Sequence, residues 1–484
     1  MRVLAIDYDA MTYAPLAIRQ RALRFAIMIA LYIAVTLLIP RPDGIAPGGW
    51  RLTGLFVATV AGLMLQPLPG GAIVLIAVTL APLLTDLKLS EALGGYADPT
   101  VWLVLAAFII ARALLNTGLA RRIALFFVRW FGSTSIGIAY SMGISDAVLA
   151  SIIPSNGARS GGVTLPILRS IAELYDSHPG ATAGRLGEYL MLAVSQSICV
   201  SAAMFFTGQA SNPLAAQMAT AAGYPVTWGS WFIAALVPGL LSLAAAPWVA
   251  MKLYPPEIRR TPRASEFARS ELAAMGPMRR EEWILAAVFV SVCGMWITSP
   301  LHKLDIAIPA LCGSVSLLIF GVVTWDDVIG ERLGWDIFLW YGGLLRLGKA
   351  LNDAHVTSTF AASIGGVFHG LSWPWLLVVA VLIYFYAHYA YASITAHILS
   401  MFPAFLAMLA AAGAPLGLAV FAFACSSNLS AGLTHYGTTP LPMFYAQGYV
   451  SMRSWWRLGF TMSLVNLVIW ATAGVLWWKL IGVW

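Results

Sequence analysis

The chain has 484 residues, of which 60% are hydrophobic and only 10% are charged. An average soluble domain carries about 25% charged residues, so this chain has too few polar side chains to surround a soluble core, and lipid must cover the rest. The net charge of +7 comes mainly from Lys and Arg in the loops between apolar segments. That distribution is typical of membrane topology and argues against a nucleic-acid partner.

About 20 apolar residues are needed to cross a bilayer. The basic segment 1–24 is expected to be cytoplasmic, and the apolar run after it shows neither a cleavable signal nor a plastid-type transit peptide. We therefore expect a bacterial inner (plasma) membrane protein. The predicted spans are, in chain order, roughly 25–40, 52–66, 71–86, 100–119, 186–206, 229–253, 283–299, 306–324, 334–351, 415–431 and 456–482.

Three further segments have other patterns. The amphipathic stretch Arg121–Trp130 is expected to lie along the membrane interface. Segments 135–174 and 373–413 are apolar but are interrupted by polar residues, at 155–157 and at 393–395. Each is long enough for two short helices that meet at a polar tip, which predicts a re-entrant hairpin. Irregular backbone at membrane depth requires protein or a water-filled cavity around it.

The chain divides into two similar halves. The tip Ser155-Asn156-Gly157-Ala158-Arg159 matches Ser393-Ile394-Thr395-Ala396-His397, and the later break at 207–213 matches 434–440. We expect one repeat at 25–252 and a second at 283–484. The linker 253–282 between them holds six arginines, so it is expected to be cytoplasmic.

Paired broken helices in corresponding halves are a sequence sign of a transporter site. A helix that begins in mid-membrane offers backbone N–H donors and the positive end of its dipole, and both favour an anion. Two such ends suit a ligand with a carboxylate at each end. Close helix packing alone would also explain single Ser and Gly residues, but it does not explain the paired motifs.

The ionisable residues near the tips are functional candidates, because charge at that depth is costly. Arg159 and His397 hold the same position in the two repeats, about one turn beyond the tip serines. His435 lies in the second break, and Asp146 could pair with Arg159. We expect His388 and Glu188 to be structural.

The residues predicted to bind substrate are Ser155, Asn156, Gly157, Arg159, Thr207, Ser211, Asn212, Pro213, Ser393, Ile394, Thr395, His397, His435, Thr438, Thr439 and Pro440. No catalytic residue, metal site or cofactor is predicted. The four cysteines, all in apolar segments, show no metal-ligand spacing. An intramembrane hydrolase built on Ser393 and the nearby histidines is a poor alternative, because its sequence motifs are missing and it leaves the two-half pattern unexplained. A channel explains the paired breaks less well than a carrier does.

The sequence resembles the divalent anion/sodium symporter family over nearly its whole length. The resemblance rests on Ala97–Leu103, Thr117–Ala124, Ile153–Gly162, Ser211–Ala215, Thr395–His397 and Leu433–Gly437. The nearest branch is that of bacterial citrate/succinate and tartrate/succinate antiporters and plant plastid 2-oxoglutarate/malate translocators. The resemblance implies an all-α polytopic fold of two inverted repeats, each with a re-entrant hairpin and a broken helix. It also implies a dimeric scaffold domain, an elevator-like transport domain, and substrate carboxylates held at the two tips.

The departures from the family concern coupling. Gly157 replaces a common threonine, and Ile394 replaces an asparagine of the sodium-coupled members. Sodium needs a cage of oxygen ligands, so a sodium site on the second tip is not expected. We expect sodium-independent exchange of small di- or tricarboxylates (the C4-dicarboxylate, 2-oxoglutarate, citrate or tartrate class), with Arg159 and His397 supplying fixed positive charge. A sodium- or proton-coupled dicarboxylate symporter is the alternative.

Overall fold

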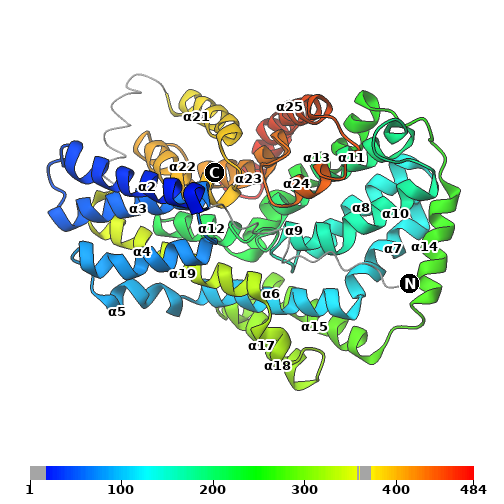
Figure 1. The fold of residues 1–484 in the computed structure, drawn as a ribbon, viewed down its shortest axis with the longest axis horizontal. Coiled ribbons are helices and arrows are strands. Elements are labelled where there is room, and N and C mark those ends of the chain that lie inside the picture. Colours follow the sequence, from blue (N-terminus) through cyan, green and yellow to red (C-terminus); the bar gives the residue numbers. More distant parts are fainter. Residues whose placement is uncertain (1–17, 357–358, 360–371) are drawn as a thin grey trace.

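The computed structural model describes residues 18–356, 359 and 372–484 (Figure 1). The expected cytoplasmic segment 1–24 therefore lies mostly outside the described residues. The described part is helical and contains no β-strand, only an isolated bridge between Thr134 and Arg260.

The helices up to the linker are α2 (Ile18–Ile33), α3 (Pro47–Leu65), α4 (Gly70–Leu84), α5 (Leu89–Ala92), α6 (Pro99–Thr117), α7 (Leu119–Phe131), α8 (Ser135–Ala150), α9 (Asn156–Arg159), α10 (Leu165–Leu174), α11 (Gly187–Met204), α12 (Asn212–Ala221) and α13 (Trp228–Leu253). Those that follow are α14 (Pro262–Ala274), α15 (Arg280–Ile297), α16 (Ser299–His302), α17 (Ala307–Ile319), α18 (Trp325–Ile329), α19 (Arg332–Asp353), α21 (Trp373–Ala387), α22 (Ile394–Ala411), α23 (Leu416–Leu429), α24 (Pro440–Tyr445), α25 (Met452–Ile469) and α26 (Val475–Leu480).

Eight helices among the described residues are long and apolar enough to cross a membrane: Ile18–Leu38, Pro47–Leu65, Pro99–Thr117, Trp228–Leu253, Trp373–Ala390, Ile394–Ala411, Leu416–Leu433 and Met452–Leu480. The protein is thus an all-α, multi-pass membrane protein. Each predicted span coincides with a helix to within a few residues at most ends. The short helix α5 was not expected.

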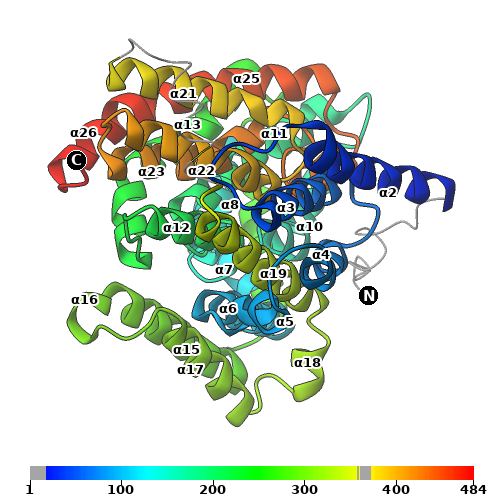
Figure 2. The same cartoon turned by 90° about the vertical axis from the view of Figure 1, so that its left-hand side faces the viewer.

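The helices of the two halves pack crosswise. Helix α4 packs against α19, and α17 packs against α6 (Figures 1 and 2). By the offset of 238 residues between the two tips, α4 corresponds to α17 and α6 corresponds to α19. Each of the two contacts therefore joins a helix of one half to the counterpart of the next long helix in the other half, as two related halves would.

Both predicted hairpins are present. In the first, α8 meets α9, which continues through the π-turn η3 (Ser160–Thr164) into α10. In the second, α21 and the short turn η5 (His388–Ala390) meet α22. The chain is also non-helical at 205–211, between α11 and α12, and at 434–439, after the turn η6 (Ser430–Leu433) that follows α23. These two segments are the predicted breaks.

The linker is more ordered than the predicted basic loop, because it contains α14, which packs along α7 at one end of the molecule (Figure 1). Arg121 Nη2 lies 2.6 Å from Glu271 Oε2, and Arg122 Nε lies 2.8 Å from Glu282 Oε1. Two of the three arginines of the amphipathic segment thus bind linker carboxylates, while Phe126 and other apolar side chains on the same helix are exposed.

Candidate substrate-binding site

The first hairpin tip contacts the second break. Ser155 precedes the helix, and its Oγ accepts a hydrogen bond from the Ala158 amide at 3.1 Å. Asn156 Nδ2 donates to Thr438 Oγ1 at 3.0 Å. A Cβ atom on Gly157 would lie 2.9 Å from Thr439 Cγ2, so the missing side chain allows this close approach. Residues of the first half and of the second half therefore meet at this point.

The second tip has the same local structure. Ser393 Oγ accepts a hydrogen bond from the Ala396 amide at 3.4 Å, as the N-cap of α22. Ser393 and Thr395 are half-buried, whereas Ile394 is buried. Serine side chains thus satisfy an amide at the start of both helices, which is the usual role of an N-cap.

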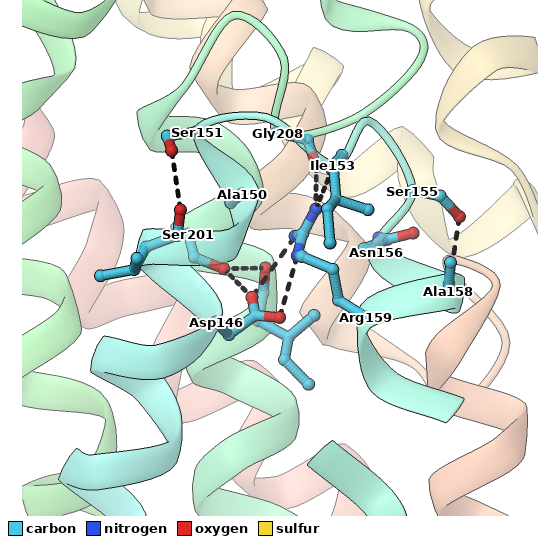
Figure 3. A network of polar contacts seen from close by, with 12 residues as sticks. Asp146, Ala150, Ser151, Ile153, Ser155, Asn156, Ala158, Arg159, Ser201 and Gly208 are labelled. Carbon is cyan, nitrogen blue, oxygen red and sulfur yellow. Dashed lines mark hydrogen bonds and ion pairs between the residues drawn. The ribbon is translucent and has the colours of Figure 1, made fainter. Parts of the chain in front are cut away.

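Arg159 is fully buried and makes four hydrogen bonds (Figure 3). Its Nε and Nη2 donate to the two carboxylate oxygens of Asp146, at 2.9 and 3.3 Å. Its Nη1 donates to the carbonyls of Ile153 and Gly208, at 2.7 and 2.9 Å. Ser201 also donates to Asp146. The possible pairing with Asp146 is confirmed, and it corrects the expected role of Arg159: its charge is already balanced and cannot serve as an unpaired cation.

His397 is also fully buried, but its partner is another imidazole. The Nδ1 atoms of His397 and His388 lie 2.9 Å apart, and His388 Nε2 lies 2.9 Å from the Gly437 carbonyl oxygen. The rings of Tyr384 and Tyr391 stack on His397, with centroids at 4.2 and 5.0 Å. His388 therefore belongs to the same cluster as His397, although we expected a separate structural role for it.

Arg159 and His397 belong to equivalent networks, one in each half. Asp146 and Tyr384 are separated by 238 residues, as are Arg159 and His397. Asp146 binds Ser201 on α11, and the Tyr384 hydroxyl binds Ser427 Oγ on α23 at 2.8 Å. Each network joins both hairpin arms to the helix that precedes a break, and each reaches a glycine carbonyl within that break.

Several predicted residues of the first break bind within the protein. The Thr207 hydroxyl donates to the Ser151 carbonyl at 2.6 Å and accepts from the Trp228 indole at 3.1 Å. Asn212 Nδ2 donates to the Ala202 and Phe205 carbonyls at 2.8 and 2.9 Å. Pro213 follows within the first turn of α12. These contacts fix the shape of the break.

Other polar atoms near the breaks have no such partner. Within the described part of the chain, Ser211 Oγ and Thr434 Oγ1 are buried and make no hydrogen bond, and neither does Asn428 Oδ1. Buried polar atoms in that state usually have a functional or solvent partner to explain them. We did not predict Thr434 or Asn428, although Thr434 matches Thr207 in the repeat.

The remaining predicted residues line the second break. His435 is half-buried; its ring lies 4.5 Å from that of Tyr445, and its Nδ1 accepts from the Trp456 indole at 3.3 Å. Thr439 is exposed and Pro440 begins α24. Contacts from Asn156 through Thr438 and the adjacent Gly437 to His388 connect the first tip with the second hairpin. Polar contacts therefore connect the first tip, the second break and the second hairpin in one region inside the protein.

The second half of this region carries no fixed charge. Residues 354–452 include no Asp, Glu, Lys or Arg, and Arg159 is paired with Asp146 in the first half. The region thus offers hydroxyl, amide and imidazole groups and two helix N-termini. Such groups bind a small anion through hydrogen bonds rather than through a permanent cation.

Comparison with known proteins identifies the family of the chain. The model of the protein family described as the sodium:sulfate symporter transmembrane region matches residues 19–484. Dicarboxylate transporter 1, chloroplastic, of Spinacia oleracea is 41% identical over 92% of this chain and 79% of its own. The protein of the same name from Arabidopsis thaliana is 40% identical over 92% of this chain and 81% of its own. Inner membrane protein YbhI of Escherichia coli is 33% identical over 94% and 98% of the two chains.

Among solved structures, the YdaH transporter of Alcanivorax borkumensis aligns with 96% of this chain and 98% of its own, at 14% identity and a TM-score of 0.49. The family and its named relatives are transporters, so the protein is a transporter and not the hydrolase considered above. The chain belongs to the family of the sodium:sulfate symporter transmembrane region, the divalent anion/sodium symporters.

Proposed function

We propose that this transporter exchanges small di- or tricarboxylate anions without sodium. The observation that carries the proposal is the Asn156–Thr438 hydrogen bond, by which the first serine-capped helix start contacts the second break; the adjacent Gly437 carbonyl then accepts from His388 of the second hairpin. Two donor-rich ends suit an anion with a carboxylate at each end. The named dicarboxylate transporters among the relatives support the same substrate class.

In this proposal, the substrate binds to groups at the two tips and the breaks. The side chains assigned to direct contact are those of Ser155, Asn156, Ser211, Ser393, Thr395, His435, Thr438 and Thr439. Gly157, Ile394, Pro213 and Pro440 shape the tips and breaks. Arg159, Thr207, Asn212 and His397 act behind them, because their polar contacts are to the protein itself.

The sodium independence rests on the second tip. Ile394 is only 2% exposed and its side chain offers no oxygen ligand, whereas sodium needs a cage of oxygen ligands. Two helix starts without a bound anion would also present unbalanced partial positive charge during reorientation. The empty carrier would therefore return slowly, which favours exchange over net uptake.

We also propose an elevator mechanism, in which the hairpins move with the substrate against a dimeric scaffold formed by the crosswise-packed helices. We propose that the repeats occupy 25–252 and 283–484, with segment 1–24 and the linker 253–282 in the cytoplasm. The name of the Escherichia coli relative supports a bacterial inner membrane.

Counterflow of labelled succinate into proteoliposomes tests the proposal. Uptake should require unlabelled succinate or another dicarboxylate inside and should be unchanged when choline replaces sodium. Uptake that disappears without sodium would favour the symporter alternative. Equal uptake into empty and preloaded vesicles would also contradict obligatory exchange.

A further inference from the structure

The hydrogen bonds of the two buried histidines determine where each imidazole carries its proton. The Gly437 carbonyl can only accept, so His388 Nε2 must donate to it. In the neutral ring His388 Nδ1 is then an acceptor, and His397 Nδ1 must be the donor across the 2.9 Å contact. His397 Nε2 is consequently left with a lone pair.

That lone pair has no well-aligned hydrogen-bond partner within the described part of the chain, although the His397 ring lies close to the Tyr384 backbone, and His397 is fully buried. An orphaned acceptor at the centre of a helical membrane protein is costly. One proton on His397 Nε2 would leave the Nδ1–Nδ1 hydrogen bond intact, because His397 remains its donor. The pair can therefore hold one added proton without breaking its link to the second break.

The surroundings favour that proton only when an anion is present. The Tyr384 and Tyr391 rings stack on His397, and aromatic faces stabilise a cation. The helices of the second hairpin and break contain no Asp, Glu, Lys or Arg. A buried imidazolium without a counter-charge is unfavourable, and a carboxylate at the Ser393 tip, one helical turn away, would provide one.

Charged side chains on the neighbouring helices do not compete for this role. On α3, Arg51 pairs with the Asp86 carboxylate at 3.3 Å and is exposed. Arg453 and Arg457, on α25, are exposed as well. The Asp146–Arg159 pair is closed on itself in the first half. Among the residues that the structure describes, the other titratable groups in ring contact with the pair are the two tyrosines.

We propose that the His388–His397 pair is a proton-binding site, at which one proton binds together with the carboxylate substrate. This inference rests on the proposed function, because it assigns a proton to each substrate anion bound at the tips. Binding of proton and anion would be mutual: the anion raises proton occupancy, and a lower pH tightens anion binding by the same coupling.

Calorimetry on the purified full-length protein tests the proposal. Succinate binding would be measured at pH 7.5 in two buffers of different ionisation enthalpy, since the difference in heat counts protons taken up. We expect nearly one proton per succinate, and a dissociation constant that rises with pH by at most about tenfold per unit, the limit for one linked proton. Absence of proton uptake by the wild type would overturn the proposal.

Variants locate the proton. His397→Gln removes the imidazole and cannot be protonated, so succinate should bind more weakly and proton uptake should fall to zero. His178→Gln, in an exposed loop outside both hairpins, is the matched control and should take up protons as the wild type does. Continued uptake by His397→Gln would place the proton elsewhere and overturn the assignment.

Two outcomes separate this inference from the proposed function. If His397→Gln does not fold, the proton count of the wild type still decides whether a proton binds with succinate. Counterflow without proton uptake would reject the proton site and leave the exchange function standing. Absence of counterflow in the wild type would reject both.

Discussion

The clearest test of the site is the removal of Arg159, because the sequence and the structure predict different results. The sequence suggested an unpaired cation near the substrate, whose loss would weaken binding about ten- to a hundredfold, at roughly 1.5–3 kcal/mol per charge-assisted hydrogen bond. The structure shows the guanidinium paired with Asp146 and bonded to the Ile153 and Gly208 carbonyls. Arg159→Gln should therefore chiefly destabilise the fold.

The magnitude follows from the burial of the pair. Both side chains are fully buried, and removal of one partner of a buried pair costs about 3–5 kcal/mol. An unfolding entropy of about 2.1 cal/mol/K per residue gives about 1 kcal/mol/K for 484 residues. The melting temperature should then fall by about 3–5 °C.

The assay is thermal unfolding in detergent, followed by tryptophan fluorescence, together with succinate affinity. Asp146→Asn should cost a similar amount, and the double variant should be more stable than the sum of the two losses predicts, because neither buried charge is left alone. Arg112→Gln is the control: its side chain is 41% exposed and lies 3.9 Å from Asp327 and Glu331, so a loss of about 0–1 kcal/mol is expected.

A different result would refute this reasoning. If Arg159→Gln unfolds at the wild-type temperature and binds succinate ten- to a hundredfold more weakly, Arg159 contacts the substrate. The structure would then represent a state in which that contact is not made.

Three further predictions follow from other parts of the molecule. A cysteine at the exposed Arg269 in the linker, in a variant without the four native cysteines, should react with an impermeant maleimide only from the cytoplasmic side; Ser265 is a poorer site because it is buried. Gly157→Ala should slow exchange severalfold, since its Cβ would lie 2.9 Å from Thr439 Cγ2, and Thr439→Ser in the same chain should restore the rate. Burial raises the pKa of Glu282, but hydrogen bonds from Arg122 and the Arg279 amide outweigh it, so the pKa is lowered overall. The stabilisation by Glu282 should be complete above the ordinary carboxyl pKa and lost as the pH falls through the lowered pKa; in acid thermal unfolding Glu282→Gln should show less pH dependence, and equal slopes would contradict this.

Much of the fold could be predicted because it follows from local composition. Long apolar runs, the prolines and the polar tips indicated the spans, both hairpins and both breaks, and the structure places helices and irregular segments there. Helix α14 was not predicted, since its pattern has few apolar residues. Its position depends on ion pairs with α7, such as that between Arg121 and Glu271, and long-range pairing of charges is not visible in a local pattern.

For the candidate site, the sequence indicated the equivalent residues of the two halves but not the contacts that their side chains make. The repeat correctly marked Arg159 and His397 as equivalent, and both lie one turn beyond a serine-capped tip. It did not show where their polar atoms point, because that depends on residues far along the chain. We expected His388 to be structural, and in the structure it connects His397 to the Gly437 carbonyl of the second break.

The same repeat spacing also relates pairs of residues that are in contact in the two halves. A separation of 238 residues relates Asp146 to Tyr384 as well as Arg159 to His397. Each pair is in contact, by an ion pair in the first half and by stacked rings at 4.2 Å in the second. A contact identified in one half therefore predicts the contacting pair in the other, even where the chemistry has changed. In this protein the change replaces the permanent Asp146–Arg159 ion pair with the Tyr384–His397 contact. An imidazole can accept a proton, whereas the guanidinium holds its proton permanently. Any dependence of transport on protons is therefore expected to arise in the second half.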